Sequence, residues 1–431
     1  MAGRPYLLRM SAKFSLLEEL SWRGMVYQHT DGLRDALATK SVSAYAGFDP
    51  TASSLHVGHL VPVMGLAHLQ RSGHRPIALV GGGTGMIGDP SGKTAERQLL
   101  SAEEIESNAG SIGKQLERFL DFSGARGALM RDNAAWLRPL KAVDFMRDVG
   151  KHFTVNYMLA KDSVQSRIEG GISFTEFSYM LLQAYDFLEL NRREGVTLQI
   201  GGSDQWGNIT AGLELIRRVT GETAHALTMP LVTTASGSKF GKTEAGAVWL
   251  DSARTSPYKF YQYWINVDDR DVGKYLRLFT LMPRQEIEAL EGLVETAPEK
   301  REAQQALARD LTGRVHGDDA ARVAEEVSRV LFGKADPGTL SETVLRALSE
   351  EVPFTESATV PGLSDALVAL KLVASKSAAR RLIEQGGIYV NGQRATADTD
   401  LASTTPLIGG YRLLRKGAKE YGLVRSKAGG A

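Results

Sequence analysis

Two histidines open a predicted helix at a place where phosphate could bind. His56 and His59 belong to the stretch H-V-G-H, and their spacing puts both side chains on one face of the first turn. Backbone N–H groups there already favour an anion, and imidazoles can add hydrogen bonds to phosphate as negative charge moves. The small Gly58 lets a flat base approach the backbone. Taken alone, the pair could also be ordinary surface or core histidines. A zinc site is a weaker alternative, because the chain has no cysteine and no third ligand at suitable spacing.

A second possible phosphate contact lies much later in the chain, in the stretch K-F-G-K-T. Lys239 and Lys242 are three residues apart, with Thr243 next, inside the Ser-, Gly- and Thr-rich stretch 235–246. Such a loop can close over a polyphosphate and neutralise the charge that develops on it. By itself this pattern is more often a solvated loop, so its meaning depends on the histidine motif.

The glycine-rich stretch 81–94 imitates two other nucleotide sites. Gly83 to Gly88 matches G-x-G-x-x-G after a predicted strand, but that fingerprint needs a helix through its last glycine, and a proline follows Asp89 at once. The segment from Gly88 to Thr94 resembles a P-loop, yet it has three residues between its glycines where the P-loop has four. We therefore favour a tight loop that holds Asp89.

These groups need a sheet to position them, and the sequence predicts one. Short apolar runs alternate with helical patterns between residues 41 and 234. The expected strands are Val42–Phe48, Ile77–Val80, Gly127–Met130, Val196–Ile200 and Leu227–Val232. The expected helices are Val57–Arg71, Ala102–Leu120, Ala142–Val149, Phe174–Leu190 and Ile209–Val219. This alternation is typical of an α/β fold with a Rossmann-like, doubly wound parallel sheet, in which ligands bind at the carboxyl ends of the strands.

The expected helix Phe174–Leu190 carries a narrow polar stripe. Tyr179, Gln183 and Asp186 fall at positions i, i+4 and i+7, with apolar residues on either side. A solvent face normally shows Lys and Glu, so the stripe predicts a helix that faces a pocket, with an exposed face as the alternative. At the start of the helix, the pattern S-x-x-E from position 173 fits a capping box.

The rest of the chain predicts further domains. A catalytic domain is expected at 1–234, the K-F-G-K-T loop and a helical domain at 235–349, a linker at 350–361 and a small basic α+β module at 362–431. The last 71 residues carry a net charge of +6 and the preceding 360 carry −5, which gives the overall +1. Basic side chains on a folded module favour structured RNA, bound through its phosphates, over the alternative of a solvated basic tail.

The two phosphate motifs together resemble the paired signatures of class I aminoacyl-tRNA synthetases. Four more stretches are similar to the bacterial tyrosyl-tRNA synthetase family: 45–51 (YAGFDPT), 81–93 (GGGTGMIGDPSGK), 174–186 (FTEFSYMLLQAYD) and 199–208 (QIGGSDQWGN). The resemblance runs from about residue 15 to about residue 425, and several of its motifs match over ten or more positions. The C-terminal module also resembles a small RNA-binding unit found in a ribosomal protein and in pseudouridine synthases.

The resemblance implies a role for individual residues. Tyrosine is expected to bind through its phenolic hydroxyl to Tyr45 and Asp186, and through its other groups to Asp89, Tyr179, Gln183 and Gln205. The residues expected to bind ATP are Gly47, Asp49, His56, Gly58, His59, Gly202, Asp204 and Lys242. The residues expected to act in catalysis are His56, His59, Lys239, Lys242 and Thr243. The residues expected to contact tRNA are Arg217, Arg218, Lys376, Arg380 and Arg381.

The implied reaction joins L-tyrosine to tRNA(Tyr). The tyrosine carboxylate attacks the α-phosphate of ATP, which is bound with Mg²⁺, and pyrophosphate leaves; a ribose hydroxyl of the tRNA then takes the tyrosyl group. No protein-bound metal or organic cofactor is expected, and the family is dimeric. No apolar run approaches the length of a membrane span, so we expect no membrane partner and a cytoplasmic location.

Two alternative functions stay open. A tryptophanyl-tRNA synthetase shares both phosphate motifs, but Tyr45, Asp186 and the basic module favour the tyrosyl enzyme. A synthetase-derived RNA-binding or splicing factor without activity is the alternative from another class. The intact H-V-G-H and K-F-G-K-T motifs argue against such a loss of catalysis.

Overall fold

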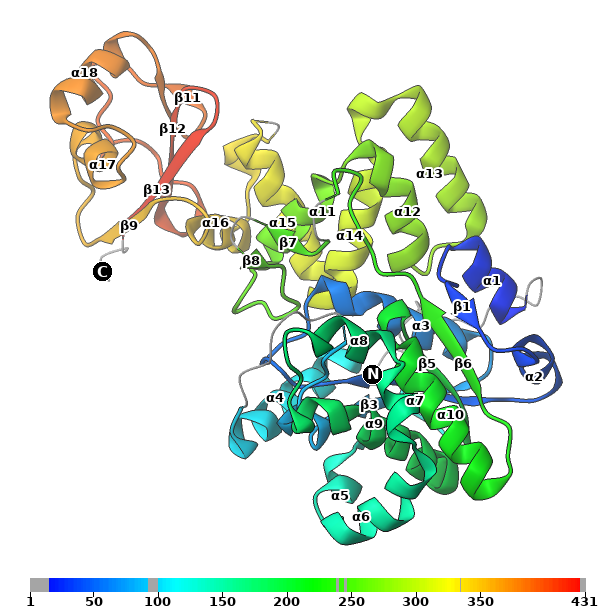
Figure 1. Cartoon of the computed structure of the whole chain (residues 1–431). Coiled ribbons are helices and arrows are strands. Elements are labelled where there is room, and N and C mark those ends of the chain that lie inside the picture. Colours follow the sequence, from blue (N-terminus) through cyan, green and yellow to red (C-terminus); the bar gives the residue numbers. More distant parts are fainter. Residues whose placement is uncertain (1–14, 92–99, 238–239, 244–245, 334, 427–431) are drawn as a thin grey trace. The chain divides into compact units, whose positions relative to one another are not determined.

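The computed structural model describes residues 15–91, 100–237, 240–243, 246–333 and 335–426. The chain forms two compact units (Figure 1). One comprises Met1–Thr255 and Val267–Leu307, and the other comprises Ser256–Asn266 and Ala308–Ala431. The expected domain boundaries, which would keep 235–349 together, stay a prediction. Among the described residues, none of the helices has the length and apolar character that crossing a membrane requires.

A six-stranded sheet lies at the centre of the first unit. Its strands are β1 (Gln28–His29), β2 (Ser43–Phe48), β3 (Arg75–Val80), β4 (Leu129–Asp132), β5 (Val196–Gly202) and β6 (His225–Met229), in the order β1-β6-β5-β2-β3-β4. All neighbouring pairs are parallel except β1 and β6. The chain runs outwards from β2 in two directions, so the carboxyl ends of β2 and β5 flank the point where such sheets bind ligands.

The five predicted strands are confirmed, with shifted ends. β6 stops at Met229 because Pro230 has no N–H to donate to a ladder. β4 begins at Leu129 because Gly127 belongs to a turn, in which its N–H donates to the carbonyl of Gly124 over 3.1 Å. The antiparallel β1 was not predicted, because two residues give no readable alternation.

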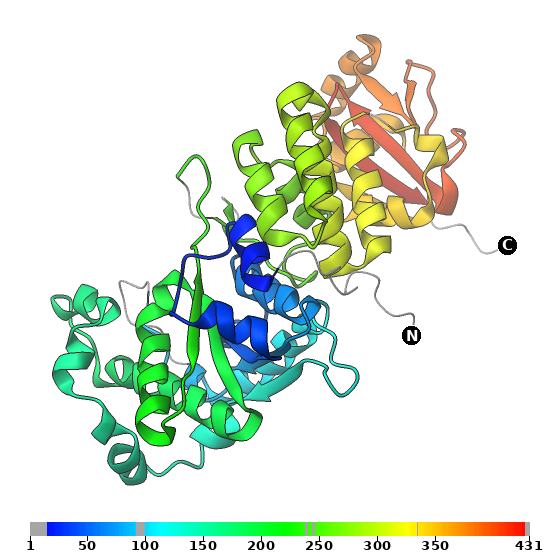
Figure 2. The same ribbon diagram turned by 90° about the vertical axis from the view of Figure 1, so that its right-hand side faces the viewer.

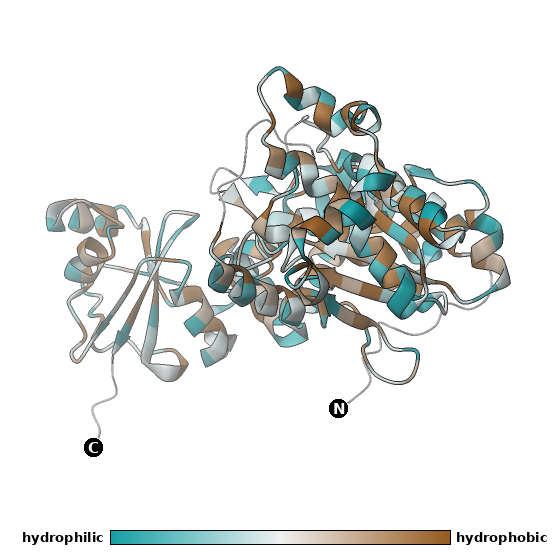
Figure 3. Ribbon diagram, turned by 60° about the horizontal axis from the view of Figure 1, so that its bottom comes forward, coloured by the Kyte–Doolittle hydropathy of each residue, from teal (hydrophilic) through white to brown (hydrophobic). Residues whose placement is uncertain are grey.

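Helices wind around this sheet (Figure 2). α3 (Leu60–Arg71) packs against β2, β3 and β5, whereas α9 (Phe174–Glu194) and α10 (Trp206–Thr220) pack against each other and against β5. Figure 3 shows mostly hydrophobic strands among helices that carry both hydrophobic and hydrophilic stretches. The other helices that lie wholly in this unit are α1 (Leu16–Trp22), α2 (Leu33–Thr39), α4 (Ala102–Leu116), α5 (Ala134–Leu137), α6 (Ala142–Asp148), α7 (Val155–Leu159), α8 (Asp162–Ile168), α12 (Asp269–Phe279) and α13 (Arg284–Thr296).

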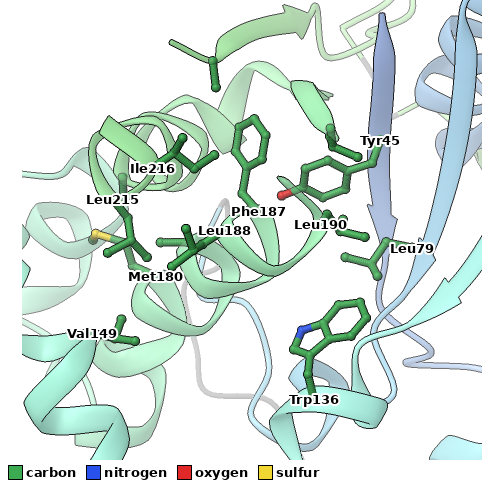
Figure 4. Close-up of a cluster of buried hydrophobic side chains, with 14 of the residues drawn as sticks. Tyr45, Leu79, Trp136, Val149, Met180, Phe187, Leu188, Leu190, Leu215 and Ile216 are labelled. Carbon is green, nitrogen blue, oxygen red and sulfur yellow. The ribbon is translucent and has the colours of Figure 1, made fainter. Parts of the chain in front are cut away.

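The hydrophobic core beside α9 and α10 also contains two polar aromatic side chains that lie next to the cavity described below. Phe187 is fully buried and packs edge-on against the ring of Tyr45, with 5.2 Å between the ring centroids. Trp136 belongs to the same buried cluster, and Figure 4 shows it beside Tyr45 and Leu79. The two polar aromatic side chains are therefore fixed by core packing, which holds their OH and N–H groups in place.

A buried guanidinium ties the N-terminal helix to the end of α12. Arg23 follows α1 and donates to the carboxylate of Glu19 over 2.7 Å. Its other nitrogens donate to the backbone carbonyls of Arg277, Thr280 and Met282 over 2.7–2.9 Å. Carbonyls at a helix C-terminus have no partner within the helix, so a cation that donates to several of them stabilises this end.

The predicted capping box at α9 is half correct. Ser173 accepts a hydrogen bond from the backbone N–H of Glu176, as expected. The Glu176 carboxylate does not return to the backbone of Ser173; it forms a two-fold ion pair with Arg167, at 2.9 and 3.1 Å. Both side chains of this pair are buried, and an ionised carboxylate that is buried is stabilised by a charged partner, which here outweighs the local capping preference.

The second unit combines helices with a five-stranded sheet. Its helices are α11 (Pro257–Ile265), α15 (Asp318–Leu331), α16 (Glu342–Ser349), α17 (Leu363–Ala369) and α18 (Lys376–Glu384), together with most of α14 (Glu302–His316). Its strands are β9 (Phe354–Ser357), β10 (Ile388–Val390), β11 (Gln393–Arg394), β12 (Tyr411–Lys416) and β13 (Glu420–Ser426), in the order β11-β10-β12-β13-β9. Residues 350–361 were expected to be a linker, but they contain β9, which pairs in parallel with β13.

Short elements complete the chain. A two-stranded hairpin is formed by β7 (Lys242–Thr243) and β8 (Gly246–Ala247). Turns of 3-10 helix are η2 (Val57–His59), η3 (Thr84–Met86), η4 (Gly150–His152), η5 (Ser203–Gln205), η6 (Pro298–Lys300), η7 (Pro337–Thr339) and η8 (Ile408–Gly410). The segments η2, η3, η5 and the hairpin all contribute to the cavity described next.

Candidate active site

A cavity of about 670 Å³ opens at the carboxyl ends of β2 and β5. Its volume is that of a small-molecule site. Of the residues predicted to bind tyrosine or ATP, the structure brings all onto its wall: Tyr45, Gly47, Asp49, His56, Gly58, His59, Asp89, Tyr179, Gln183, Asp186, Gly202, Asp204, Gln205 and Lys242. Every one of them belongs to the first unit, as do the other described residues that line the cavity.

The backbone fixes the proton positions of the two histidines. The predicted helix Val57–Arg71 begins with the 3-10 turn η2, and His56 caps that turn by accepting the N–H of Gly58 at its Nδ1, 3.0 Å away. His59 in turn accepts the N–H of His56 at its own Nδ1, 3.1 Å away. Because both Nδ1 atoms accept, a neutral ring carries its proton on Nε2. Both rings line the cavity and can donate that proton to an anion.

Gly58 has a further reason to be glycine. A Cβ at this position would lie 2.7 Å from the His56 ring, so any larger residue would displace the imidazole from its N–H donor. Gly58 therefore fixes His56 directly, in addition to leaving space at the cavity wall.

The K-F-G-K-T segment is joined to the histidine segment through the backbone. Gly241 has a φ of +76°, and a Cβ there would lie 2.8 Å from the side chain of Val57. Its carbonyl accepts the N–H of Val248 over 3.0 Å, and the carbonyl of Val248 accepts the N–H of Val57 over 3.0 Å. Two motifs that are far apart in the sequence thus lie side by side.

The predicted catalytic residues of this segment have different positions. Lys242 is exposed and lines the cavity. Thr243 is exposed, does not line the cavity, and donates its hydroxyl to the carbonyl of Gly246 over 3.2 Å. Lys239 lies outside the described residues. The catalytic roles of all three stay predictions.

A buried polar pair marks the deep end of the cavity. Asp186 accepts hydrogen bonds from the Nδ2 of Asn133 at 2.8 Å and from the Nε1 of Trp136 at 2.7 Å. Tyr45 is 1% exposed, and its hydroxyl has no hydrogen-bond partner among the residues that the structure describes. A buried O–H without a partner is costly, so this end of the cavity suits a ligand that brings a polar group to it.

The sequence pattern gave no sign of Asn133 and Trp136. Both residues follow β4 closely and therefore lie at the edge of the sheet where ligands bind. Their position after a predicted strand is the sequence feature that could have indicated them. The Oδ1 of Asn133 also accepts the N–H of Gly83 over 2.7 Å. This bond attaches the glycine-rich loop to the residues that surround Asp186.

Burial shifts the acid–base properties of this deep end. It raises the pKa of Asp186 to about 8, although the hydrogen bonds from Asn133 and Trp136 act to lower it. Burial, followed by the nearby charge of Asp186, raises the pKa of the Tyr45 phenol well above its usual range. Tyr45 is therefore a neutral hydrogen-bond donor at every physiological pH.

The raised pKa of Asp186 predicts how stability changes with pH. An unfolded Asp titrates near pH 3.9, so between about pH 4 and 8 the folded protein holds a proton that the unfolded chain has released. The free energy of unfolding should then fall with rising pH, by at most about 1.4 kcal/mol per pH unit from this group. Asp186→Asn should remove this part of the slope. Urea unfolding at pH 5.5 and 8 checks the prediction, and parallel curves for the two proteins would contradict it.

Hydrogen bonds from two side chains position Asp49, which directly follows the last residue of β2. Tyr179 donates its hydroxyl to Oδ2 of Asp49 over 2.8 Å, and Thr84 donates its hydroxyl to Oδ1 over 2.7 Å. The hydroxyl oxygen of Tyr179 is thereby left to accept hydrogen bonds on the cavity side. Burial, followed by the charges of Asp49 and Asp89, raises the pKa of Tyr179 well above its usual range, so Tyr179 stays protonated.

Three of the residues predicted to bind tyrosine, Asp89, Gln183 and Gln205, form one cluster with a residue that was not predicted. Gln205 donates to Oδ2 of Asp89 over 2.7 Å, and Gln183 donates to the Oε1 of Gln205 over 3.3 Å. Asn208 reaches Gln183, Gln205 and Asp89 from α10. Several acceptor oxygens therefore converge on the wall of the cavity, as a cationic group requires.

The glycine-rich loop does not form a dinucleotide-binding turn, and its last glycine does not lie in a helix. Between β3 and Ser91, the described residues form the short turn η3, and Gly88 has a φ of +89°. A Cβ at Gly81 would collide with the carboxylate of Asp49, and one at Gly82 would collide with the carboxylate of Asp132. These glycines leave room for carboxylates, and the segment 92–99, which holds the end of the imitated P-loop, lies outside the described residues.

The basic residues predicted to meet tRNA lie away from the cavity wall. Arg217 and Arg218 near the end of α10 both donate to Glu214, so their charges are partly neutralised. Lys376 pairs with Asp365 at the start of α18, and Arg380 and Arg381 are exposed on the same helix. Their contacts with tRNA stay predictions.

Comparison with known proteins places the chain in a family. The family model for class I tRNA synthetases (W and Y) matches residues 37–333, and the model for the Tyrosine--tRNA ligase SYY-like C-terminal domain matches residues 345–424. The chain is 56% identical to the tyrosine--tRNA ligase of Roseiflexus castenholzii over 424 residues, which cover 95% of this chain and 99% of that protein. It is 54% identical to the Geobacillus stearothermophilus tyrosine--tRNA ligase over 417 residues, covering 95% of this chain and 99% of that one.

A solved structure agrees with the sequence relatives. The C-terminally truncated mitochondrial tyrosyl-tRNA synthetase of Aspergillus nidulans matches with a TM-score of 0.66 and 31% identity, covering 74% of this chain and 94% of that chain. This structure and the family model agree on the fold that was expected from the strand–helix alternation. The chain belongs to the class I tRNA synthetase family of the tryptophan and tyrosine enzymes.

Proposed function

We infer that this protein is a tyrosine–tRNA ligase. The relatives named above cover almost its whole length, and the tyrosine-type C-terminal domain is present. The observation that carries the choice of substrate is the buried Tyr45 hydroxyl, which lacks a protein partner among the described residues and lies in the same cavity as Asp186. A phenolic hydroxyl supplies a partner for both groups, whereas phenylalanine leaves Tyr45 unpaired. Neither the tryptophanyl alternative nor the catalytically inactive one is favoured.

We propose that activation proceeds without a general base. The substrate carboxylate is already ionised and attacks the α-phosphorus of ATP. A new oxygen–phosphorus bond forms, and the bond from the α-phosphorus to the bridging oxygen breaks, so that pyrophosphate leaves with its electron pair. Such a reaction depends on positioning and on stabilisation of charge. ATP carries Mg²⁺ with it as part of the substrate; among the described residues there is no group of three or more His, Asp or Glu side chains that could hold a metal ion.

The roles of the cavity residues follow from their donors and acceptors. His56 and His59 donate from Nε2 to the phosphate oxygens, and Lys242, with Lys239 and Thr243, stabilises the leaving pyrophosphate. Asp204 and Gly202 lie after β5 and serve the ribose, and Gly47 and Gly58 leave room for the nucleotide. At the other end, Asp89, Tyr179 and Gln183 accept the three N–H bonds of the tyrosine ammonium.

The test of this function is tyrosine-dependent exchange between ATP and pyrophosphate. We expect exchange with L-tyrosine and almost none with phenylalanine or tryptophan as control substrates. Transfer of the tyrosyl group is then measured with tRNA(Tyr). Binding of RNA without exchange would favour the catalytically inactive alternative, and exchange with tryptophan would favour the tryptophanyl enzyme.

We also propose that the protein acts as a homodimer through the segment from α6 to the start of α9. Among the described residues, five of the eleven large hydrophobic side chains that are exposed lie in this segment: Val143, Met146, Val155, Ile168 and Phe174. Phe174 is 73% exposed at the first position of α9. Apolar side chains gathered in this way favour burial against a second copy.

Phe174→Glu should convert the dimer to a monomer, because a carboxylate would have to be buried without a partner. We expect dimerisation to weaken by at least about tenfold, since burying even a partly compensated polar group costs about 1–3 kcal/mol. Sedimentation velocity at several protein concentrations measures the change. Phe332→Glu is the matched control, because Phe332 is also exposed but lies in the second unit. A Phe174→Glu protein with unchanged mass would contradict the proposed interface.

We propose that α18 contributes to binding of tRNA(Tyr) through Arg380 and Arg381. Replacing both with alanine should raise the KM for tRNA and reduce the slope of log binding constant against log salt by about 2, one unit for each lost phosphate contact. Pyrophosphate exchange should not change. The control is the double replacement of Arg329 and Arg346, two exposed arginines elsewhere in the second unit. Equal effects of the two double variants would contradict a specific role for α18.

The cytoplasmic location stays a prediction.

A further inference from the structure

Asn208 lies at the centre of the polar cluster beside the cavity. It is the third residue of α10 and is 3% exposed. Its Nδ2 lies 3.1 Å from the Oε1 of Gln183, 3.2 Å from the Oε1 of Gln205, 3.2 Å from the Oγ of Ser91 and 3.4 Å from the Oδ1 of Asp89. One amide nitrogen therefore faces oxygen atoms from the loop after β3, from α9 and from η5.

The directions of these hydrogen bonds are fixed by Asp89. Oxygen atoms of a carboxylate only accept, so the Nε2 of Gln205 at 2.7 Å and the Nδ2 of Asn208 at 3.4 Å must be the nitrogen sides of their amides. The Oε1 of Gln205 then accepts from Asn208 and from the Nε2 of Gln183. Gln183 is left with its Oε1 as the acceptor that Asn208 also contacts.

Orientation matters because the two ends of a glutamine amide are nearly equal in size and opposite in polarity. Rotation by 180° exchanges C=O and NH₂ without a change in packing, so hydrogen bonds alone decide which end faces a ligand. With its oxygen towards the cavity, Gln183 can accept an N–H from an ammonium group. With its nitrogen there, it would present a donor to a cation and repel it.

We propose that Asn208 is a positioning residue that keeps the acceptor side of Gln183 towards the tyrosine ammonium. This inference rests on the proposed function, since it refines the recognition of tyrosine within the same cavity. Gln205 keeps its own orientation through the 2.7 Å bond to Asp89, and without Asn208 the amide of Gln183 is oriented by the longer 3.3 Å bond from its Nε2 to Gln205 alone. Loss of Asn208 should therefore weaken the control of Gln183 more than that of Gln205.

Three ligands separate this role from a structural one. L-Tyrosine carries both charged groups, tyramine has the ammonium without the carboxylate, and 3-(4-hydroxyphenyl)propanoate has the carboxylate without the ammonium. In Asn208→Ala we expect the Kd of L-tyrosine and of tyramine to rise by about tenfold, the effect of one hydrogen bond to a charged group. The Kd of the propanoate should stay within about twofold. Calorimetry on the full chain measures all three.

The matched control is Asn191→Ala. Asn191 is 7% exposed, and its amide nitrogen also donates to two oxygens, those of Val196 and Glu222, but it does not line the cavity. It should not change the ratio of the tyramine Kd to the propanoate Kd. An equal rise for all three ligands in Asn208→Ala, or no rise, would overturn the proposal.

A second variant keeps the test decisive if Asn208→Ala is poorly folded. Gln183→Glu supplies an acceptor oxygen to the cavity whatever the rotation of the group, although it loses the hydrogen bond to the Oε1 of Gln205. The effect of changing Asn208 is therefore measured within this background. Adding the conservative Asn208→Ser to Gln183→Glu should leave the tyramine Kd unchanged, whereas Asn208→Ser alone should raise it. Equal effects of Asn208→Ser in both backgrounds would overturn the role of orientation. Tyrosine-dependent exchange by the unmodified protein tests the proposed function separately from these binding ratios.

Discussion

His56→Ala should slow the formation of tyrosyl-adenylate by about 10²–10³-fold and leave the Kd of tyrosine within about twofold. The imidazole lines the cavity beside His59, with 4.0 Å between the ring centroids, and the backbone of Gly58 keeps its proton on Nε2. A preorganised donor of this kind acts on charge that develops on the phosphate, and no hydrogen bond among the described residues joins His56 to Asp186, the proposed partner of the phenol. Its loss therefore affects the reaction rate and not the binding of the phenol ring.

Lys242→Ala should behave in the same way, since Lys242 lines the same cavity as His56. The measurement is single-turnover formation of the adenylate, with the Kd of tyrosine determined in the absence of ATP. His29→Ala serves as a control, because His29 is an exposed histidine on β1 that does not line the cavity. Equal losses in rate and in tyrosine affinity would contradict the assignment of both residues to the phosphate.

Asp186→Asn should lower kcat/KM for tyrosine by at least about 10²-fold, because the hydrogen bond to the phenolic hydroxyl and the pairing of buried donors are lost together. Both carboxylate oxygens already accept from the protein, one from Asn133 and the other from Trp136. The NH₂ of an asparagine would face one of these donors and leave it unpaired. The change therefore disturbs the deep end of the cavity as well as its contact with the substrate.

The same replacement should reduce discrimination against phenylalanine. Phenylalanine makes no hydrogen bond at the deep end, so its low kcat/KM should fall much less than that of tyrosine. Tyr45→Phe is the matched milder change, with an expected loss of about tenfold for tyrosine, because it removes a hydroxyl that has no protein partner among the described residues. Exchange assays with both amino acids give the ratio, and an unchanged ratio in Asp186→Asn would contradict the assignment.

Local periodicity predicted the parts of the site that lie on one element. Tyr179, Gln183 and Asp186 share one face of α9 because helical spacing alone decides this, and all three line the cavity. The partners of Asp186 could not be predicted in the same way. Asn133 and Trp136 come from the end of β4, and only the packing of α9 beside the sheet brings them within hydrogen-bonding distance.

Other differences between expectation and structure have the same cause. The S-x-x-E pattern predicts a capping box, yet Glu176 pairs with the buried Arg167 and the local rule gives way to a tertiary one. The segment Phe354–Ser357 resembles a linker by composition, and it becomes a strand because β13, more than sixty residues later, offers an open edge. Proximity created by the fold cannot be read from a short window of sequence.

Because the first unit is built from two separate stretches of the sequence, it cannot fold completely until late in translation. The first unit needs Val267–Leu307 in addition to Met1–Thr255, with α11 of the other unit encoded in between. The carbonyls that Arg23 contacts belong to Arg277, Thr280 and Met282, so the N-terminal helix lacks these partners until they leave the ribosome. At about 5–20 residues per second, that wait lasts tens of seconds. A nascent chain stalled before residue 267 should therefore expose the buried face of α1 to proteases and chaperones.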